Sequence, residues 1–402
     1  MNKTPLVRFK GFTDDWEQRK LGEMGTTFTG LSGKSKEDFG HGDARFVTYM
    51  NVFTNPVSDP ARVEAVEIDK RQNAVQYGDV FFTTSSETPE EVGMSSVWLK
   101  KTENTYLNSF CFGYRPTDTI DHHYMAYMLR SETVRKRIIY LAQGISRYNI
   151  SKNGVMQIEV PLPDLEEQKL IGEYFINLDN LITLHQHKYE KLLNIKKSML
   201  YKMFPQNSSK VPEIRFAGFT DEWEQRKLGK LAIFNPKAEL PEIFEYVDLE
   251  SVVGTEMISH RTESKITAPS RAQRLARTGD LFYQTVRPYQ KNNYLFEKPD
   301  KHYVFSTGYA QMRPLVDGQF LLSLVQNENF VKMVLDNCTG TSYPAINSND
   351  LADIEVLSPT EKEEQRIIGS FFKGIGNLIT LHQRKLEKLK QLKQAMLHKM
   401  FV

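Results

Sequence analysis

A 38-residue segment occurs twice in this chain and carries the same heptad pattern in both copies. Residues 167–204 align without gaps to residues 364–401, with 22 of 38 positions identical. Mainly apolar residues recur at alternating steps of three and four, which is a 3.5-residue repeat over five heptads. One helix alone cannot bury such a seam, so we expect two long helices that pack on each other as a coiled coil.

The expected seam contains one histidine and one lysine in each copy. The seam positions are Ile171, Phe175, Leu178, Ile182, His185, Tyr189, Leu192, Lys196, Met199 and Met203, then Ile368, Phe372, Ile375, Ile379, His382, Leu386, Leu389, Lys393, Met396 and Met400. Polar seam residues can fix register or topology. We prefer that interpretation over a metal site formed by His185 and His382. The spacings of Asp164 to Glu167 and of Thr360 to Glu363 predict capping boxes at the helix starts.

A shorter motif is also duplicated, "GFTDDWEQRKLG" at residues 11–22 and "GFTDEWEQRKLG" at 218–229, with 11 of 12 positions identical. Each half therefore has the order motif, divergent region, long helix. The expected segments are 1–160, 161–204, 205–358 and 359–402, with the polar stretch "FPQNSSKVPE" between the halves. Four aromatic residues are expected to pack as a joint where each divergent region meets a helix end: Phe12, Trp16, Phe219 and Trp223.

The divergent regions contain short, β-branched and aromatic runs punctuated by Gly, Pro and Asn, which predict strands. Examples are "FVTYMNVF" (46–53), "AVQYGDVFFTT" (74–84), "EYVDLESVV" (245–253) and "TGDLFYQTV" (278–286). Amphipathic patterns at about 121–142 and 318–336 predict one or two helices late in each region. The fold class is therefore α+β, with two mixed helix-and-strand domains in a pseudo-symmetric tandem repeat, separated by two long helices.

Composition and motifs exclude several functional classes. No apolar run approaches the length that spans a membrane, and the N-terminus has no apolar signal core, so we expect a cytoplasmic protein with no membrane partner. Cys111 and Cys338 are interpreted as reduced thiols. The sequence has no P-loop, GxGxxG after a strand, HExxH or GxSxG motif. For His122 and His123 we prefer a capping or solvated role over metal binding, so no metal or catalytic residue is expected.

Local charge is more informative than the net charge of +2. Residues 130–152 carry six Lys/Arg and one acid, and residues 261–293 carry seven Lys/Arg and two acids. Clustered Lys and Arg neutralise phosphates, and Arg, Asn and Gln read base edges. A solvated helix face with ordinary loops explains the same counts, so charge alone leaves both interpretations open.

Taken in order, the duplicated features resemble the specificity subunit of Type I restriction-modification systems over essentially the whole chain. The resemblance rests on the "GFTD[DE]WEQRKLG" motifs and on the transitions "IEVPLPDLEEQKLIGEYF" and "IEVLSPTEKEEQRIIGSFF" into the long helices. It implies that each divergent region is a target recognition domain reading one half of a split DNA sequence. It also implies that the helices pair antiparallel and set the gap between the half-sites.

The same resemblance implies a non-catalytic chain with double-stranded DNA and two kinds of protein partner. Two methyltransferase subunits, and through them two restriction-translocase subunits, would assemble with it. S-adenosylmethionine, ATP and Mg²⁺ would belong to those partners, and "FNPK" (234–237) lacks the second proline and the aromatic residue of a methylation motif. Two alternatives remain: a methyltransferase or nuclease with its own reading modules, and a coiled-coil scaffold or stand-alone DNA-binding module without methylase partners.

Loops that follow equivalent strands in the two halves differ in their side chains, as expected of two binding modules with different specificities. We expect DNA contacts in the first half from Thr83, Thr84, Ser85, Ser86, Arg147, Tyr148 and Asn149. In the second half we expect them from Gln284, Arg287, Tyr289, Lys291, Asn292, Ser342 and Tyr343.

Overall fold

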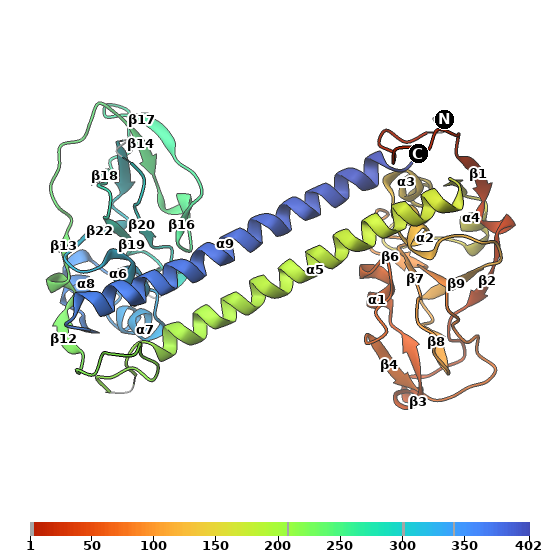
Figure 1. The fold of residues 1–402 in the computed structure, drawn as a ribbon, viewed down its shortest axis with the longest axis horizontal. Helices are drawn as coiled ribbons and strands as arrows, with labels where there is room; N and C mark the ends of the chain where they lie inside the picture. The colour runs from red at the N-terminus through yellow and green to blue at the C-terminus, as the bar shows by residue number, and fades with distance from the viewer. Residues whose placement is uncertain (1–3, 207–208, 300–301, 341) are drawn as a thin grey trace. The chain divides into compact units, whose positions relative to one another are not determined.

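The structure, a computed structural model, describes residues 4–206, 209–299, 302–340 and 342–402. Contacts divide the chain into two compact units (Figure 1). Unit 1 comprises Met1–Gln186 and Arg384–Val402, and unit 2 comprises His187–Gln383. Among the described helices, none is long and apolar enough to cross a membrane. The four segments expected from the sequence remain a prediction, because the units divide each long helix between them.

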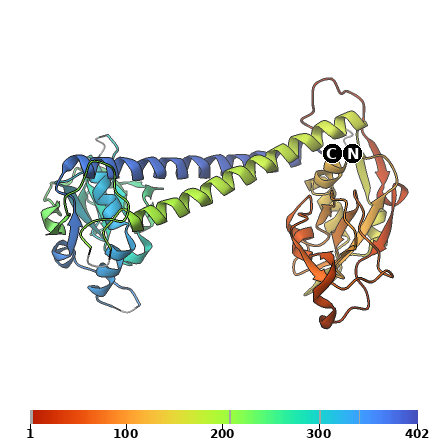
Figure 2. The ribbon, with the colours of Figure 1, turned by 60° about the horizontal axis from the view of Figure 1, so that its bottom comes forward.

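Two helices of 38 residues each, α5 (Leu165–Lys202) and α9 (Lys362–Lys399), take up the repeated segments (Figure 2). In unit 1 the start of α5 and the end of α9 contribute to one hydrophobic core. In unit 2 the end of α5 and the start of α9 do the same. The two helices are therefore antiparallel, and the predicted fold class is confirmed.

Burial along both helices follows the predicted 3.5-residue repeat. Ile171, Phe175 and Leu178 are buried in unit 1, and Ile368, Phe372 and Ile375 are buried in unit 2. The remaining seam positions are half-buried or buried: Ile182, His185, Tyr189, Leu192, Lys196, Met199, Met203, Ile379, His382, Leu386, Leu389, Lys393, Met396 and Met400. Most of their neighbours on the opposite helix face are exposed, so the heptad pattern identified the inward face correctly.

Module 1 (residues 17–162) is the helix-and-strand body of unit 1. Its strands are β1 (Glu17–Lys20), β2 (Gly25–Thr29), β3 (Phe39–Val47), β4 (Val63–Val66), β5 (Val80–Thr83), β6 (Ser85–Ser86), β7 (Ser95–Val97), β8 (Thr105–Leu107), β9 (Cys111–Pro116), β10 (Tyr148–Asn149) and β11 (Glu159–Leu162). Its α-helices are α1 (Tyr49–Thr54), α2 (His122–Met128), α3 (Glu132–Tyr140) and α4 (Lys152–Met156). The sheet orders are β2-β9-β5-β7, β4-β3-β8, β1-β11 and β10-β6.

Module 2 (residues 224–358) is the corresponding body of unit 2. Its strands are β12 (Glu224–Lys227), β13 (Ala232–Phe234), β14 (Ile243–Val247), β15 (Val252–Val253), β16 (Glu256–Met257), β17 (Arg261–Ser264), β18 (Ala272–Leu275), β19 (Leu281–Gln284), β20 (Tyr294–Leu295), β21 (Tyr303–Ser306), β22 (Tyr309–Pro314) and β23 (Glu355–Ser358). Its α-helices are α6 (Gly318–Val325), α7 (Glu328–Asp336) and α8 (Ser348–Asp353). The sheet orders are β13-β22-β19-β20, β17-β14-β21-β18, β12-β23 and β15-β16, so the duplication extends to the fold of the divergent regions.

One predicted strand is a helix. The run "FVTYMNVF" leaves β3 at Val47 and continues as α1, because the Thr48 side chain accepts a hydrogen bond from the Asn51 backbone N–H and caps the turn. In "EYVDLESVV" the Asp248 side chain similarly caps a 3₁₀ turn over Leu249–Ser251. The capping side chain outweighs the β propensity of the apolar residues around it. The predicted helices at 121–142 and 318–336 are confirmed as the pairs α2–α3 and α6–α7.

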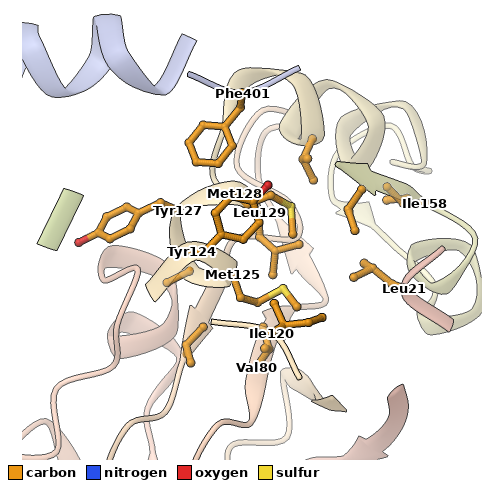
Figure 3. Packing of buried hydrophobic residues seen from close by; sticks show 14 of the residues in the cluster. Leu21, Val80, Ile120, Tyr124, Met125, Tyr127, Met128, Leu129, Ile158 and Phe401 are labelled. Atoms are coloured by element: carbon orange, nitrogen blue, oxygen red, sulfur yellow. The ribbon is translucent and has the colours of Figure 1, made fainter. Parts of the chain in front are cut away.

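The core of unit 1 lies where α2 meets α5, β1, β11 and the end of α9 (Figure 3). The Phe401 ring lies 5.7 Å from the Phe175 ring, 5.7 Å from the Tyr124 ring and 6.5 Å from the Trp16 ring. In unit 2 the Phe204 ring has the equivalent partners Trp223, Phe320 and Phe372. Each core is therefore completed by a phenylalanine at the end of the other half's helix.

The first turn of each long helix contains a buried glutamate whose carboxylate binds an arginine and a tryptophan instead of completing a capping box. Glu167 accepts hydrogen bonds from Arg8 Nε (2.7 Å), Arg8 Nη2 (2.8 Å) and Trp16 Nε1 (3.1 Å). Glu364 has the same partners in Arg215 and Trp223. Asp164 does cap the Glu167 backbone N–H at 2.8 Å, but the Glu167 side chain does not return the bond. The capping box predicted at Thr360 and Glu363 is wrong, because α9 begins at Lys362 and Glu363 accepts from Arg366.

Trp16 and Trp223 lie buried at the positions expected for the joint. The phenylalanines that pack beside them on the helices are Phe9, against Tyr174, and Phe216, against Phe371. Phe12 and Phe219 are half-buried, and no ring partner for either is found within the described residues. The motif's neighbouring residues, Arg8-Phe9 and Arg215-Phe216, thus make the contacts that were assigned to Phe12 and Phe219.

The two cysteines are free thiols and lie in different units. Cys111 is 3% exposed, and burial raises the pKa of its thiol to about 12. Cys338 is half-buried, and burial raises its thiol pKa as well. Because a buried thiol reacts only when its surroundings open, Cys111 can report on the stability of unit 1, and the half-buried Cys338 is a less protected reporter of unit 2.

Candidate DNA interface

The two loops of module 1 that were expected to contact DNA lie side by side. Strand β6 pairs antiparallel with β10, with Tyr148 opposite Ser86 and Asn149 opposite Ser85. Arg147 Nη2 donates to Ser85 Oγ at 3.1 Å. Residues 83–86 and 147–149, about 60 positions apart in the sequence, are therefore held next to each other.

The corresponding loops of module 2 are also adjacent. Val286 forms an antiparallel bridge with Ala345, and the Arg287 backbone N–H donates to Pro344 O at 2.8 Å. The Arg287 guanidinium lies 4.5 Å from the centroid of the Tyr343 ring, a cation–π contact. The loop after β19 and the loop before α8 thus meet as their counterparts do in module 1.

The same backbone hydrogen bonds hold both loop pairs. In module 1, Thr84 N and Oγ1 donate to Phe110 O at 3.0 and 2.8 Å, and Ile150 N donates to Thr84 O at 3.0 Å. In module 2, Thr285 N and Oγ1 donate to Gly308 O at 3.0 and 2.8 Å. Ile346 N then donates to Thr285 O at 3.0 Å. The frame is conserved between the halves although the loop side chains differ.

Several of the nominated residues are buried and support the loops. Thr83 is fully buried, and its Oγ1 accepts from Met94 N at 3.0 Å. Ser85 and Ser86 are buried in the β6–β10 pair. Gln284 is 2% exposed, and its Nε2 donates to Val286 O and Gln290 Oε1. In this structure these side chains hold the loops rather than present themselves to a ligand, which differs from the expected contact with DNA.

The other nominated residues reach the surface at least in part. Tyr289 is 49% exposed and Tyr343 is 63% exposed. The remaining exposed or half-buried positions are Thr84, Arg147, Tyr148, Asn149, Arg287, Lys291, Asn292 and Ser342. Asn292 Oδ1 accepts from Gly254 N at 2.8 Å, and Lys291 Nζ lies 2.6 Å from Glu328 Oε1. These two side chains are therefore partly engaged within module 2.

Two cationic residues of the module 2 loop have left-handed backbone conformations. Arg287 has φ 53° and Lys291 has φ 56°, and the 3₁₀ turn Pro288–Gln290 lies between them. A side chain other than glycine in this region costs about 1–2 kcal/mol, and such strain clusters at functional sites. The loop contacts described above maintain the strained conformation.

The corresponding loops of the two modules carry opposite charge. Between β6 and β7, module 1 has the exposed carboxylates Glu87, Glu90 and Glu91 and no cation. Between β19 and β20, module 2 has Arg287 and Lys291 and no carboxylate. The two loop surfaces therefore offer different hydrogen-bonding chemistry to a shared type of ligand.

An aromatic and apolar groove that was not predicted from the sequence lies beside the module 1 loops. Tyr49, Met50, Phe53 and Phe110 line it together with Arg147. Met50 is 50% exposed, Phe110 is 56% exposed, and Tyr49 OH donates to Ser85 O at 2.8 Å. Because residues 46–53 were interpreted as a strand, nothing indicated that one face of this segment would border the loops.

The basic runs contain fewer available cations than their composition indicates. Arg130 donates to the backbone carbonyls of Ser95, Val52, Phe53 and Asn55. Arg135 donates to three further backbone carbonyls, and burial lowers the pKa of its guanidinium to about 10. In module 2, Arg261 is paired with Asp248 and Glu263. These arginines stabilise the modules and are not free to neutralise phosphates.

The histidine pair of module 1 has a structural setting. Asp121 caps α2 by accepting from Tyr124 N at 2.8 Å, and the His122 ring packs edge-on against Tyr77. Burial lowers the pKa of His122. Within the part of the chain that the structure describes, no group of three potential metal ligands is found.

Comparison with known proteins identifies the family. Residues 13–194 match the family described as "Type I restriction modification DNA specificity domain". Residues 13–194 thus form a Type I specificity domain, and the chain as a whole is similar to the specificity subunits of Type I restriction-modification systems. It is 23% identical to the MjaX specificity subunit of Methanocaldococcus jannaschii, over 96% of this chain and 92% of that one. It is 22% identical to the MjaVIII specificity subunit of the same organism, over 87% of this chain and 84% of that one.

A solved structure supports the fold of the specificity subunit over its whole length. The crystal structure of the Type I restriction-modification S subunit from M. genitalium matches with a TM-score of 0.64 and 15% identity. The match covers 99% of each chain. At this identity the match shows the fold alone, and the loop chemistry must be argued from the residues of this chain.

Proposed function

We propose that this specificity subunit recognises a two-part DNA sequence, with module 1 reading one half-site and module 2 the other. The observation that carries the proposal is the pair of loop surfaces held by the same hydrogen bonds at Thr84 and Thr285 but carrying different side chains. A constant frame with variable surface groups is what two readers of different sequences require.

The loop chemistry suggests what each module reads. Carboxylates accept hydrogen bonds from the exocyclic amino group of cytosine, whereas Arg donates to guanine O6 and N7. Module 1 offers Glu87, Glu90 and Glu91 beside Arg147, and module 2 offers Arg287 and Lys291. The exposed rings of Phe110, Tyr289 and Tyr343 provide apolar or stacking contacts at the same surfaces.

The residues proposed to contact DNA are the accessible members of the predicted set. In module 1 they are Thr84, Arg147, Tyr148 and Asn149, and in module 2 they are Arg287, Tyr289, Lys291, Asn292, Ser342 and Tyr343. Thr83, Ser85, Ser86 and Gln284 are proposed to position these residues. The helices α5 and α9 are proposed to set the gap between the half-sites.

The subunit itself is proposed to be non-catalytic and to direct other subunits to the bound site. Two methyltransferase subunits and two restriction-translocase subunits would assemble on it, as the family resemblance implies. S-adenosylmethionine, ATP and Mg²⁺ would be bound by those subunits. Of the duplicated segments, Glu224–Lys227 is exposed and Glu17–Lys20 is half-buried apart from the exposed Glu17, and both are proposed to contact these subunits.

Exchange of module 1 tests the proposal directly. Residues 25–160 are replaced by the corresponding region of another specificity subunit, and the genomic methylation pattern is mapped in cells that contain the methyltransferase subunit. We expect one half-site to change while the other half-site and the gap stay the same. An unchanged motif would contradict the proposal. A coiled-coil scaffold without methylase partners would instead yield no methylation and no methyltransferase on co-purification.

Single substitutions should relax single positions of the target. Arg147→Ala is expected to lower discrimination at one base pair of the module 1 half-site about 10–100-fold, because a bidentate base contact contributes about 1–3 kcal/mol. Arg287→Ala should do the same in the other half-site. Lys101→Ala, an exposed lysine outside both loop pairs, is the matched control. If Arg147→Ala, like Lys101→Ala, lowers methylation by the same factor at every target sequence, then Arg147 reads no base pair. Its role would then be phosphate binding at most.

A further inference from the structure

Four side chains of unit 1 join module 1 to the helix pair. Lys393 Nζ of α9 lies 2.5 Å from Asp179 Oδ1 of α5. Tyr127 OH of α2 donates to Asp179 Oδ2 at 2.7 Å, and the Lys393 ammonium lies 5.3 Å from the centroid of the Tyr127 ring. We call Lys393, Asp179, Tyr127 and Arg130 the unit 1 stack.

Arg130 extends the stack into the body of module 1. Its guanidinium donates to Ser95 O of β7 and to three backbone carbonyls at the end of α1, at 2.7–3.0 Å. Its charge interacts favourably with Asp179. The stack thus connects both long helices with α2, α1 and β7 through charged and hydrogen-bonded groups, which hold a fixed geometry better than apolar contact does.

The duplicated architecture identifies the counterpart of each stack residue in unit 2. Asp317 caps α6 by accepting from Phe320 N, as Asp121 caps α2, and Gln365 binds Asp317 N as Gln168 binds Asp121 N. These matched bonds align Tyr127 with Ser323 and Arg130 with Gln326. The 38-residue repeat aligns Asp179 with Gly376 and Lys393 with Lys196.

All four counterparts line one hollow of about 170 Å³ in unit 2. Lys196 is half-buried there, and no ion pair of Lys196 is found among the described residues. Ser323 Oγ donates to Gln319 O of its own helix, and Gln326 Nε2 donates to Lys291 O of the recognition loop.

The part-buried connection between helix pair and module in unit 1 is therefore replaced in unit 2 by a hollow with two exposed contacts in its lining. These are the ion pair of Lys373 Nζ with Glu297 Oε1 (2.7 Å) and the hydrogen bond from Thr380 Oγ1 to Glu256 Oε1. Solvent screens such exposed contacts, so they hold a geometry less firmly than the stack does.

The backbone beside the hollow is also less constrained. Gly374 and Gly376 of α9 stand where α5 has Asn177 and Asp179. A Cβ atom at either glycine would meet nothing within 4 Å, so packing does not require glycine at these positions. Glycine in a helix interior lowers the preference for the helical conformation. The hollow and the glycines, of which Gly376 lines the hollow, thus act at the same place and both weaken the packing there.

We propose that the unit 1 stack fixes module 1 on the helix pair, whereas the hollow lets module 2 shift, so that residues 323, 326 and 376 determine how strictly the gap is kept. This inference rests on the proposed function, in which α5 and α9 set the gap. Module 2 can then change its position on the helix pair. This movement permits methylation of sites whose gap differs by one base pair from the preferred length.

Transplanting the stack tests the inference. Ser323→Tyr with Gly376→Asp introduces, in the hollow, side chains equivalent to Tyr127 and Asp179 of the unit 1 stack. Lys196, which lines the hollow, supplies the cation equivalent to Lys393. In the full chain, hydrogen exchange of the α9 amides at 373–380 is expected to slow at least about tenfold. Gly374→Ala, for which open space exists, should slow the same amides without rebuilding the stack and covers the case in which the double variant folds poorly. Adding Lys196→Met to the double variant should remove most of its gain.

The reverse transplant, Tyr127→Ser with Asp179→Gly, is the matched control and should speed exchange at the facing amides of α5. Unchanged exchange in both transplants would overturn the inference. The second measurement is methylation of a DNA library with varied gaps by the assembled methyltransferase complex. The double variant is expected to reduce methylation at gaps one base pair from the preferred length about tenfold relative to wild type.

The two measurements separate this inference from the function on which it rests. Slower exchange with an unchanged gap distribution would overturn the role of residues 323, 326 and 376 in specificity. Loss of any gap preference in the wild-type complex, whatever the exchange rates, would instead contradict the proposed two-part reading. Slower exchange with a narrowed gap distribution supports both.

Discussion

Glu167→Ala is expected to lower the free energy of unfolding of unit 1 by about 3–5 kcal/mol. The Glu167 carboxylate is buried and accepts from both Arg8 nitrogens and from Trp16 Nε1. Its removal leaves the Arg8 guanidinium with little compensation and the buried indole N–H without a partner. The pKa of Arg8 is raised by its bond to Glu167, which shows that the pair stabilises the charged form.

The measurement is urea-dependent labelling of Cys111, which lies in unit 1, with Cys338 as the reporter of unit 2. Glu167→Ala should shift the Cys111 transition to lower urea and leave the Cys338 transition nearly unchanged. Glu364→Ala should give the opposite result, because Glu364 binds Arg215 and Trp223 in unit 2. Glu166→Ala is the control, since Glu166 is an exposed neighbour that pairs with Lys169, and should change stability by less than about 1 kcal/mol. Equal effects of Glu167→Ala and Glu166→Ala would show that the buried carboxylate contributes no more to the free energy of unfolding of unit 1 than the exposed one does.

The long helices could be predicted from the sequence because the heptad signal is local and is repeated. Each seam residue lies three or four positions from the next, so no knowledge of distant contacts is needed to recognise the buried face. The role of Glu167 could not be predicted in this way. Its spacing from Asp164 is that of a capping box, and only the fold brings Arg8 to it. The repeated "RF" before each motif was the one available signal, because Arg8-Phe9 and Arg215-Phe216 extend the duplication.

The sequence showed which segments are loops, but it could not show which of them lie next to each other or which of their side chains reach the surface. Residues 83–86 and 147–149 were selected from loops, and the β6–β10 pairing that joins them is a long-range contact. Burial then separated Thr83 and Gln284 from Asn149 and Tyr343, a distinction that depends on which side chain faces inward within a turn. Composition overstated the positive charge because Arg130 and Arg135 satisfy backbone carbonyls inside module 1. The groove at Tyr49 and Phe110 was missed because a cap at Thr48 converts an apparent strand into α1.

The asymmetry between the units was only half visible in the sequence. Alignment of the repeats shows Gly376 in place of Asp179. The replacement of Tyr127 by Ser323 lies in the divergent regions, where the alignment depends on the caps at Asp121 and Asp317. The hollow can therefore be recognised only when the structures around the two ends of the helix pair are compared.

Phe401→Ala is expected to destabilise unit 1 by about 3–5 kcal/mol, although residue 401 lies more than 200 positions from the end of module 1. The Phe401 ring is 4% exposed and packs among Trp16, Tyr124 and Phe175, so truncation leaves a cavity in a closely packed aromatic cluster. A loss of 3 kcal/mol corresponds to a rise of roughly 100-fold in the open population, given about 1.4 kcal/mol per tenfold.

The expected readout is labelling of Cys111 that is roughly 100-fold faster under native conditions, with Cys338 little affected. Phe204→Ala, the equivalent substitution of the repeat, should instead speed labelling of Cys338 and leave Cys111 little affected, because Phe204 packs on Trp223, Phe320 and Phe372 in unit 2. The factor is expected to be smaller, because the Cys338 thiol is only half-buried. Leu392→Ala on the exposed face of α9 is the control and should leave both rates close to wild type. If residues 359–402 were a separate spacer segment, Phe401→Ala would leave Cys111 protected. If each helix end completes the core of the opposite half, Cys111 loses protection, and the core of unit 1 then depends on residues from both halves of the sequence.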